Sequence, residues 1–382
     1  MRVERFSSIE RVEVAAWRAL EPPDFPFFDF EFLRALERSG SVGRGSGWSP
    51  IYLVCRDKAG GVLGALCIYL KTDSFGEYIF DWEWARAYHE YGVPYYPKLT
   101  AAVPFTPATG PKLLMRPDVS DRRAVTSALL DAAKRLGDEH RVSSSHALFL
   151  PERELDDFAG RGFAVRHSVQ FHWRNRGYGE FSDYLDAMVS KRRRQIARER
   201  RQLGDEGLEI EHLTGAALSP EHASIMYRFY ISTLDRKWGS PYLTGAFFTE
   251  VFRTMGDRIL LVFARDALTK RPVAGALNFF KGQTLYGRYW GAAGRGGVRN
   301  LHFELCYYQA IEFAIERGIA LFEAGAQGEH KISRGFLPSL TYSAHEIRHP
   351  QFRRAIEQFI SSEKEMIAEE MTLYADHDPY KR

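Results

Sequence analysis

The sequence predicts an α/β protein of two domains, each with a mixed, mostly antiparallel sheet and helices on both faces. Its 382 residues are enough for two cores, and 45% apolar with 26% charged residues is the composition of a soluble globular protein. A strand hairpin occurs twice, once in each half. In both halves strands first come as hairpins and then alternate with helices, which is typical of a mixed sheet covered by helices.

The repeated hairpin indicates a duplication. Residues 51–71 and 259–281 each read as an apolar strand, a charged turn and a second strand, and Gly64-Ala65-Leu66 aligns with Gly275-Ala276-Leu277. We therefore predict an N-terminal domain over residues 1–178 and a related C-terminal domain over residues 179–382, joined through a basic helix at 181–203.

Apolar periodicity and its breaks define the elements of the first half. The predicted elements are a broken helical region at 12–37, strands at 50–56 and 62–71, a helix at 121–136, a strand at 146–150, a short helix ending at Gly160 and a strand at 163–174. Residues 75–109 are rich in Tyr, Trp and Pro and have no clear period. A segment this long without regular structure is typically functional or an insertion.

The second half repeats the order of helices, hairpin strands, helix and strand. Its predicted elements are helices at 181–203, 220–234 and 244–254, strands at 259–265, 272–280 and 284–290, a helix at 301–317, strands at 319–324 and 340–347, and an amphipathic helix at 351–373.

Composition excludes several classes of protein. The net charge of +3, from 52 basic and 49 acidic residues, argues against a dedicated DNA-binding protein. Three cysteines without metal or redox spacing suit a reducing compartment, and no metal is expected. The N-terminus lacks an apolar signal core and no run of about 18 apolar residues occurs, so we expect a cytoplasmic protein without a transmembrane segment. The oligomeric state is left open.

A glycine-rich loop follows the strand at 284–290. It spans Gly291 to Gly297 and carries Arg295, with Arg299 and Asn300 just before the helix at 301–317, which Asn300 can cap. A loop of this kind that enters a helix N-terminus binds phosphate through backbone N–H groups, although it also occurs as an ordinary flexible turn.

Charged residues occur at two apolar positions nearby. Glu304 shares a helical stripe with Tyr308 and Ile311, so it either lies at the mouth of a site or forms a structural ion pair. The strand at 319–324 contains Glu323, and the polar run Glu329-His330-Lys331 follows it. Charged clusters at the end of a central strand are where α/β sheets place their chemistry, and a solvated loop is the alternative.

The run from Arg288 through Lys331 resembles the C-terminal half of tandem-GNAT acyltransferases, including the Fem-type transferases that use aminoacyl-tRNA to build peptidoglycan cross-bridges. In that superfamily the strand leads to a glycine and an aromatic-Lys pair, here His330-Lys331. The whole chain resembles a bacterial family described as peptidoglycan biosynthesis/recognition. The matching stretches include Gly76-Glu77-Tyr78, Phe80-Asp81-Trp82, Tyr96-Pro97-Lys98-Leu99, Val103-Pro104-Phe105-Thr106-Pro107, Gln170-Phe171-His172-Trp173-Arg174-Asn175, Lys237-Trp238-Gly239, Tyr286-Gly287-Arg288-Tyr289-Trp290-Gly291, Leu301-His302-Phe303-Glu304 and residues 323–331.

The resemblance implies two tandem GNAT-like domains and an acyltransferase that moves an acetyl or aminoacyl group onto an amine, for example of a peptidoglycan precursor. The donor is acetyl-CoA or another acyl-CoA, with aminoacyl-tRNA as the alternative, and Arg288 to Ala293 fit the superfamily's Arg/Gln-x-x-Gly-x-Gly/Ala pattern. The N-terminal domain, which lacks a glycine loop before its helix, would shape the acceptor groove. An inactive module that recognises a cell-wall precursor is the other interpretation.

These inferences assign roles to the following residues. Glu323 or Glu329 is the candidate base and Lys331 stabilises negative charge; Arg288, Gly291, Gly294, Arg295, Gly296, Gly297 and Arg299 bind the donor; and Trp173, Trp290, His302, Glu304, Gln327 and His330 contact substrate.

The segment at 190–203 is strongly basic. Val189, Ile196 and Leu203 recur every seven residues and predict one packed stripe, whereas seven Lys and Arg residues between 191 and 201 cover the rest. The segment is either a solvated helix that links the domains or a contact for phosphates of a nucleotide-linked or RNA-linked substrate.

Overall fold

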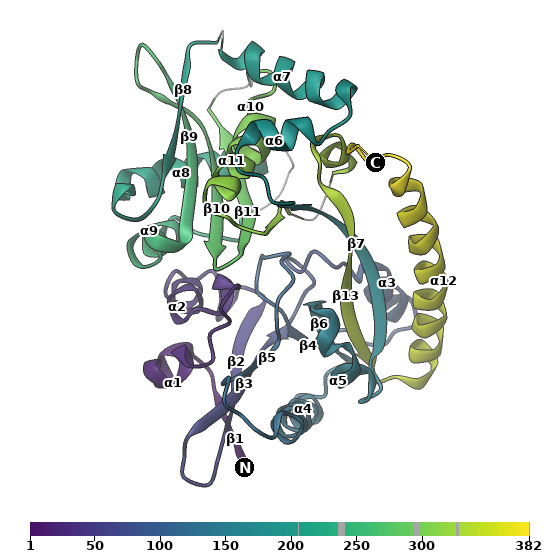
Figure 1. Ribbon diagram of the computed structural model, residues 1–382. Helices are drawn as coiled ribbons and strands as arrows, with labels where there is room; N and C mark the ends of the chain where they lie inside the picture. The colour runs from purple at the N-terminus through teal and green to yellow at the C-terminus, as the bar shows by residue number, and fades with distance from the viewer. Residues whose placement is uncertain (205, 236–240, 294–297, 326–327, 382) are drawn as a thin grey trace. The chain divides into compact units, whose positions relative to one another are not determined.

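The computed structural model describes residues 1–204, 206–235, 241–293, 298–325 and 328–381 and divides into two compact units (Figure 1). Unit 1 comprises Met1–Pro22, Phe27–Val169 and Leu340–Glu370, and unit 2 comprises Pro23–Pro26, Gln170–Ser339 and Met371–Arg382. Unit 1 therefore includes residues 340–370, which the sequence analysis assigns to the second domain.

Unit 1 is built on a mixed sheet. Its strands are β1 (Arg2–Phe6), β2 (Trp48–Arg56), β3 (Val62–Lys71), β4 (Lys98–Ala101), β5 (Leu113–Met115), β6 (Ser144–Leu150), the start of β7 (Ala164–Arg174) and most of β13 (Leu337–Ile347). Its helices are η1 (Ile9–Arg11), α1 (Val14–Arg18), most of η2 (Pro26–Phe28), α2 (Phe30–Arg38), α3 (Trp82–Glu90), α4 (Arg122–Glu139), η3 (Glu152–Glu154), α5 (Leu155–Ala159) and most of α12 (Pro350–Ala375).

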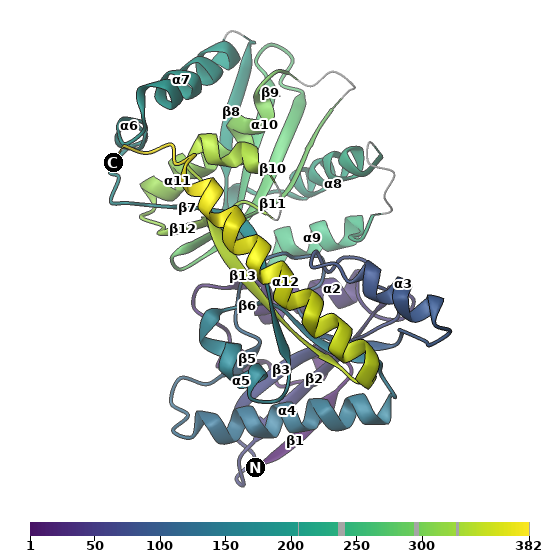
Figure 2. The ribbon, with the colours of Figure 1, turned by 90° about the vertical axis from the view of Figure 1, so that its right-hand side faces the viewer.

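Helices cover both faces of this sheet. Leu53 of β2 belongs to the core cluster formed with α4, which lies across β1, β2 and β3 (Figure 2). The adjacent Tyr52 contacts Trp17 of α1, with ring centroids 5.7 Å apart. Since neighbouring strand residues point to opposite faces, the two helices pack on opposite sides.

Unit 2 holds the other part of this sheet. Its strands are the end of β7, β8 (Leu208–Leu213), β9 (Ile259–Asp266), β10 (Pro272–Lys281), β11 (Thr284–Ala292) and β12 (Leu321–Glu323), with the first residues of β13. Its helices are α6 (Phe181–Asp186), α7 (Ser190–Gly204), η4 (Gly215–Ala217), α8 (Pro220–Asp235), α9 (Gly245–Thr254), η5 (Gly256–Arg258), α10 (Leu301–Phe303), η6 (Glu304–Tyr308), α11 (Gln309–Glu316) and η7 (Glu329–Arg334).

The two parts of the sheet share one pattern of pairing. Strands β1-β2-β3-β4 and β8-β9-β10-β11 are antiparallel in order, and in each unit the last of them pairs in parallel with the strand that follows a helix, β6 or β12. Gly64 and Gly275 both lie on the third strand of their series. The predicted repeat thus corresponds to a repeated topology, and the mixed, mostly antiparallel pairing is confirmed. The expectation of a separate sheet in each half is wrong, because the strands form one sheet in the order β1-β2-β3-β4-β6-β13-β7-β12-β11-β10-β9-β8.

Each unit receives its next strand from the other half of the sequence. β13 pairs antiparallel with β6 in unit 1, and β7 pairs antiparallel with β12 in unit 2. The helix after β13 follows it into unit 1, where Ile356 and Ile360 pack with Trp84 and Tyr88 of α3. This exchange explains why residues 340–370 are separated from the rest of the C-terminal half.

Several local predictions need correction. The expected helix at 181–203 is two helices, because it is interrupted between Asp186 and Ser190. The expected helix at 301–317 contains a turn of π-helix, η6. Strands β1, β5 and β8 were not predicted. Residues 75–109 contain α3 and β4, which were missed because buried residues such as Tyr88 and Leu99 follow no repeating apolar pattern there.

Gly291 allows α8 to approach β11 closely. A Cβ atom at Gly291 would lie 1.9 Å from the carbonyl oxygen of Phe229 on α8. The same helix is fixed to the strand by side-chain hydrogen bonds from Ser232 Oγ to the Ala292 carbonyl and from Thr233 Oγ1 to the Trp290 carbonyl, at 3.2 and 2.7 Å. A side chain at position 291 would therefore clash with the backbone of α8.

We expect Gly291→Ala to lower the free energy of unfolding by about 1–3 kcal/mol, the usual cost of overpacking. The midpoint of urea unfolding measures this loss. Gly204→Ala is the matched control, since a Cβ there meets nothing within 4 Å, and it should stay within about 0.5 kcal/mol of wild type. Equal midpoints for both variants would contradict the close approach.

Candidate functional site

The candidate site lies where two parallel strands of unit 2 separate. β11 and β12 pair at Thr284–Leu321, Leu285–Phe322 and Tyr286–Glu323, after which β12 ends while β11 continues to Ala292. Beyond this point a pocket of about 120 Å³ opens between β10, β11, the following helix and the residues after β12. Small residues line the gap, among them Gly287, Ala324 and Gly325.

Three of the predicted site residues line this pocket. Arg288 and Trp290 come from β11, and His302 comes from α10, with the His302 and Trp290 rings 5.1 Å apart and nearly perpendicular. The pairing of β10 with β11 shifts register at Arg288, because Leu277 pairs with Tyr289 and Asn278 with Gly287. The structure therefore brings together the strand and helix residues that the sequence analysis grouped.

The π-helical turn η6 supplies two lining residues that the sequence analysis missed. Cys306 and Tyr307 both line the pocket and both belong to η6. Single π-helical turns inside α-helices occur frequently at functional sites. The sequence carries no local signal for such a turn, because its residues also fit an ordinary apolar helix.

Lys331 is the most unusual charge near the pocket. Its side chain is buried, with 1% exposure, and its Nζ donates a hydrogen bond of 2.9 Å to the carbonyl of Gly325, a lining residue. It forms no ion pair with any carboxylate in the part of the chain that the structure describes. Burial lowers the pKa of Lys331 to about 8. The alternative of a solvated loop is thereby excluded for this residue.

Two buried polar residues of β7, Gln170 and His172, belong to the stretches that carry the family resemblance, but no role was predicted for them. Both are buried on β7, and His172 Nε2 lies 3.1 Å from Gln170 Oε1. Burial, with the charges of Arg174 and Lys331, lowers the pKa of His172 to about 3, so this imidazole is neutral at physiological pH. The sequence signal that could have pointed to them is the occurrence of two polar residues at alternate positions of an otherwise apolar strand.

The two candidate bases have different surroundings. Glu323 is 4% exposed at the end of β12, directly before the lining residues, and pairs in register with Tyr286 and His172. Glu329 is exposed and accepts a hydrogen bond of 3.3 Å from the Tyr374 hydroxyl. Burial next to the pocket favours Glu323 as the base.

His330 is exposed and lies close to the pocket. Its Nε2 is 3.0 Å from the hydroxyl of Tyr307, a lining residue. Partial burial lowers the pKa of His330, and the charges of Arg334 and Lys331 add to that effect. His330 therefore fits a contact at the rim of the pocket.

Glu304 and Trp173 are not among the residues that line the pocket. Glu304 forms an ion pair of 3.0 Å with Arg200 of α7 and accepts a hydrogen bond of 2.7 Å from Gln309. The structural ion pair that the sequence analysis left open is therefore present, with an arginine from α7. Trp173 is fully buried and packs against Tyr178 and Tyr184.

Part of the predicted donor and substrate sites falls outside the described residues. These positions are Gly294, Arg295, Gly296, Gly297 and Gln327, together with Lys237-Trp238-Gly239 of the resemblance. Arg299 is exposed. Asn300 does not cap α10 through its side chain, which donates instead to Gln202 at 3.3 Å.

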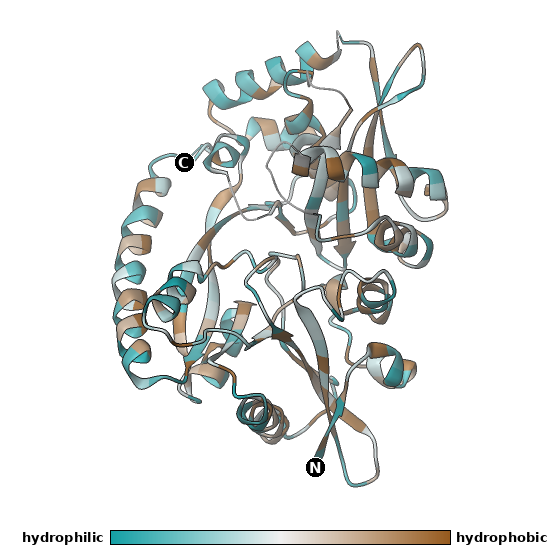
Figure 3. Ribbon diagram, turned by 180° about the vertical axis from the view of Figure 1, so that it is seen from behind, coloured by the Kyte–Doolittle hydropathy of each residue, from teal (hydrophilic) through white to brown (hydrophobic). Residues whose placement is uncertain are grey.

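The basic helix α7 has two different faces, and Figure 3 shows it as mostly hydrophilic. Ile196, Glu199 and Leu203 are buried, and Glu199 accepts hydrogen bonds of 3.0 Å from Arg334. Four exposed residues spaced three or four apart share the opposite face: Lys191, Arg194, Arg198 and Arg201. The predicted packed stripe is confirmed at Ile196 and Leu203 but is wrong at Val189, which is exposed and precedes α7.

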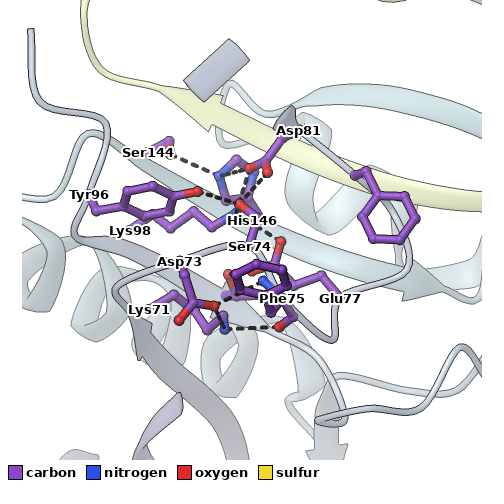
Figure 4. Close-up of polar contacts among 12 residues, drawn as sticks. Lys71, Asp73, Ser74, Phe75, Glu77, Asp81, Tyr96, Lys98, Ser144 and His146 are labelled. Atoms are coloured by element: carbon purple, nitrogen blue, oxygen red, sulfur yellow. Dashed lines mark hydrogen bonds and ion pairs between the residues drawn. The ribbon is translucent and has the colours of Figure 1, made fainter. Parts of the chain in front are cut away.

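Unit 1 contains a second group of buried charges, which Figure 4 shows in close-up. Lys98 is fully buried on β4, and its Nζ lies 2.8 Å from Glu77 Oε2 and 2.5 Å from Asp81 Oδ2. Ser74 hydrogen-bonds to both Lys98 and Asp81. These contacts fix the segment from Ser74 to Asp81 against the sheet.

The charged groups of this network form ion pairs and hydrogen bonds with one another, so they are not offered to a substrate. Burial raises the pKa of Glu77 to about 7, and Lys98 opposes that rise. For Asp81, burial acts in the same upward direction, but the Lys98 and His146 charges and hydrogen bonds from Lys98 and Ser74 hold its pKa below the usual range. We read the network as structural.

Two searches for other kinds of site give negative results. Across the described residues, no three His, Cys, Asp or Glu side chains converge in a way that suits a metal ion. Within the same residues, no helix combines the length and apolar character needed to cross a membrane.

Comparisons with known proteins bear on the fold and on the family. Among solved structures, the crystal structure of FemX matches with a TM-score of 0.54 and 12% identity over 93% of this chain and 100% of that chain. The C-terminal domain of a putative lysylphosphatidylglycerol synthetase from Agrobacterium fabrum matches with a TM-score of 0.56 and 10% identity over 91% of this chain and 94% of that one. A search of curated proteins finds no match.

At these identities the two structures are evidence for the fold alone. They share the fold of this chain over nearly its whole length, which agrees with the predicted α/β architecture of mixed, mostly antiparallel strands with helices on both faces. A family model, FemAB-like, described as peptidoglycan biosynthesis/recognition, matches residues 8–382. Because this match covers nearly the whole chain, the protein belongs to the FemAB-like family of peptidoglycan biosynthesis and recognition.

Proposed function

We propose that unit 2 transfers an acyl group from an activated donor to an amine at the pocket between β11 and β12. The observation that carries this proposal is Lys331, a buried ammonium group without a carboxylate partner in the described chain, hydrogen-bonded to a carbonyl of the pocket lining. Burying an ammonium group without a carboxylate partner costs desolvation free energy, and such groups are typical of functional sites.

The reaction needs a neutral amine and a stabilised tetrahedral intermediate. The amine nitrogen attacks the donor carbonyl, and the electron pair of the C=O bond moves to oxygen. The Lys331 ammonium stabilises this oxyanion, and Glu323 takes the proton that the attacking nitrogen loses. Collapse of the intermediate forms the amide and expels the thiolate of coenzyme A or, for the second donor, the ribose oxygen of a tRNA, which takes the proton held by Glu323 and leaves as a hydroxyl.

The donor is proposed to be an acyl-CoA, because the pocket is small and lies at the strand gap next to a helix N-terminus. Its pyrophosphate would be bound by Arg288 and by backbone N–H groups between Gly291 and Arg299, of which residues 294–297 lie outside the described chain. Gly291 itself packs against α8, so its contribution to the donor site is backbone only.

Aminoacyl-tRNA is the second candidate donor, favoured by the exposed basic face of α7. Lys191, Arg194, Arg198 and Arg201 offer four positive charges on one surface. The acceptor is proposed to be an amine of a peptidoglycan precursor, which follows from the family and from no contact in the structure. We propose a cytoplasmic bacterial enzyme, in keeping with that substrate.

Replacing Lys331 should remove transfer without damaging the fold. Lys331→Met has a similar shape and no charge, and we expect kcat to fall about 10²–10³-fold, the usual effect of losing one oxyanion contact. The variant should be as stable as wild type or more so, since a buried unpaired charge is lost. Lys270→Ala, at an exposed lysine of the same unit, is the control and should keep full activity.

Normal transfer by Lys331→Met would contradict a role in the reaction. A parallel loss of activity and melting temperature would show a structural role instead.

The pH dependence of transfer should contain the titration of Lys331. Its pKa of about 8 means that the ammonium form is present below pH 8 and is lost as the pH rises through that value. We expect kcat to fall about tenfold per pH unit above pH 8 in wild type. In Lys331→Met this alkaline fall should be absent, and an unchanged alkaline limb would assign it to another group.

Salt titration should separate the two donors. Binding of an RNA falls by about 0.7–0.9 log units per log unit of salt for each phosphate neutralised. We expect weak salt dependence for acyl-CoA, unchanged by Arg194→Ala with Arg198→Ala and Arg201→Ala. The matched control replaces exposed Arg122 and Arg123 of α4 by alanine.

Steep salt dependence for aminoacyl-tRNA that disappears in the α7 variant would instead identify tRNA as the donor. Binding of a precursor without transfer from either donor would indicate the inactive recognition module.

A further inference from the structure

Unit 1 contains a pocket that the proposed reaction does not use. It measures about 110 Å³ and lies between α4, α5 and the strands β3, β4 and β6. Its walls are apolar and include Leu66, Ile68, Leu99, Leu130 and Phe158, all of which belong to or border the core cluster of this unit. An engineered apolar cavity of about 150 Å³ binds benzene, so a pocket of this size suits a branched aliphatic group or a small ring.

The mouth of the pocket carries both signs of charge. Asp131 and Arg161 line it and form an ion pair with each other. Lys134 of α4 and Glu346 of β13 line it as well, and neither side chain forms an ion pair or hydrogen bond with another residue that the structure describes. One positive and one negative group are therefore left to contact a molecule at the rim.

Strand alternation decides which polar groups of β6 and β13 face the pocket. Ser145 and Glu346 pair in register and both line it. Ala147 and Ala344, two residues further along these strands, belong to the core cluster formed with α4, so the pocket lies on this face of the strands. A mostly apolar pocket with a few polar groups is the usual form of a small-molecule site.

We propose that this pocket binds a free amino acid with an apolar side chain. The side chain enters between α4 and the strands, the carboxylate contacts Lys134, and the ammonium group contacts Glu346. A zwitterion matches the pair of opposite charges at the mouth, whereas a simple anion would meet Glu346 and a simple cation would meet Lys134. The site lies within unit 1, so this inference goes beyond the proposed acyl transfer and does not rest on it.

Isothermal titration of the full chain with L-leucine and L-phenylalanine tests the proposal. N-acetyl-leucine lacks the ammonium charge and leucinamide lacks the carboxylate, and each should bind at least about tenfold more weakly, the worth of one charge-assisted contact. Lys134→Gln and Glu346→Gln should weaken binding of the parent amino acid by similar factors. Arg135→Gln, an exposed neighbour on α4 outside the lining, should leave it unchanged.

A variant that fills the pocket distinguishes a binding site from a packing defect. Ala133 lines the pocket, and Ala133→Leu should abolish amino-acid binding while acyl transfer by unit 2 is retained. The proposal is overturned if neither amino acid binds wild type. It is also overturned if benzene binds while the charged-residue variants have no effect, because the pocket would then be an apolar void only, or if N-acetyl-leucine binds as tightly as leucine.

Discussion

The separation of β11 from β12 is the constraint on which the candidate site depends. Parallel pairing stops at Glu323, and the chain then turns through Gly325 and returns as η7, which buries Lys331 next to the gap. The carbonyl of Gly325 is one of the groups that the missing pairing leaves available, and Lys331 takes it at 2.9 Å. If the strands stayed paired, both the pocket and the partner of Lys331 would be lost.

The same strand topology occurs in unit 1, where the charged side chains around it differ. Unit 1 repeats the parallel pair as β4 and β6, but there the corresponding region holds a self-satisfied network around Lys98, with Glu77 and Asp81 as partners. A buried ammonium group with two carboxylates is a structural arrangement, whereas the buried Lys331, unpaired with any described carboxylate, suits chemistry. The duplicated strand pattern has therefore kept its pairing in both units while its charges differ.

Much of the secondary structure was predictable because local sequence patterns encode it. The helix at 121–136 and the strands at 272–280 and 284–290 carry clear periods, and the Gly-Ala-Leu repeat indicated the duplication. The exchange of β7 and β13 was not predictable, since strand pairing across the sequence leaves no local pattern. Arg288, Trp290 and His302 were grouped correctly, because they lie on elements that are neighbours in the sequence. Cys306 and Tyr307 were missed, because the π-helical turn η6 that contains them leaves no signal in the sequence.

The central claim is that Lys331 faces the reacting carbonyl of an acyl donor. A crystal structure of the protein with a non-hydrolysable acyl-CoA analogue, in which a methylene replaces the thioester sulfur, tests it most directly. The account predicts the acyl carbonyl oxygen in the gap between β11 and β12, within hydrogen-bond distance of Lys331 Nζ. An analogue bound elsewhere, or one whose carbonyl points away while Lys331 stays on Gly325 alone, would contradict the account.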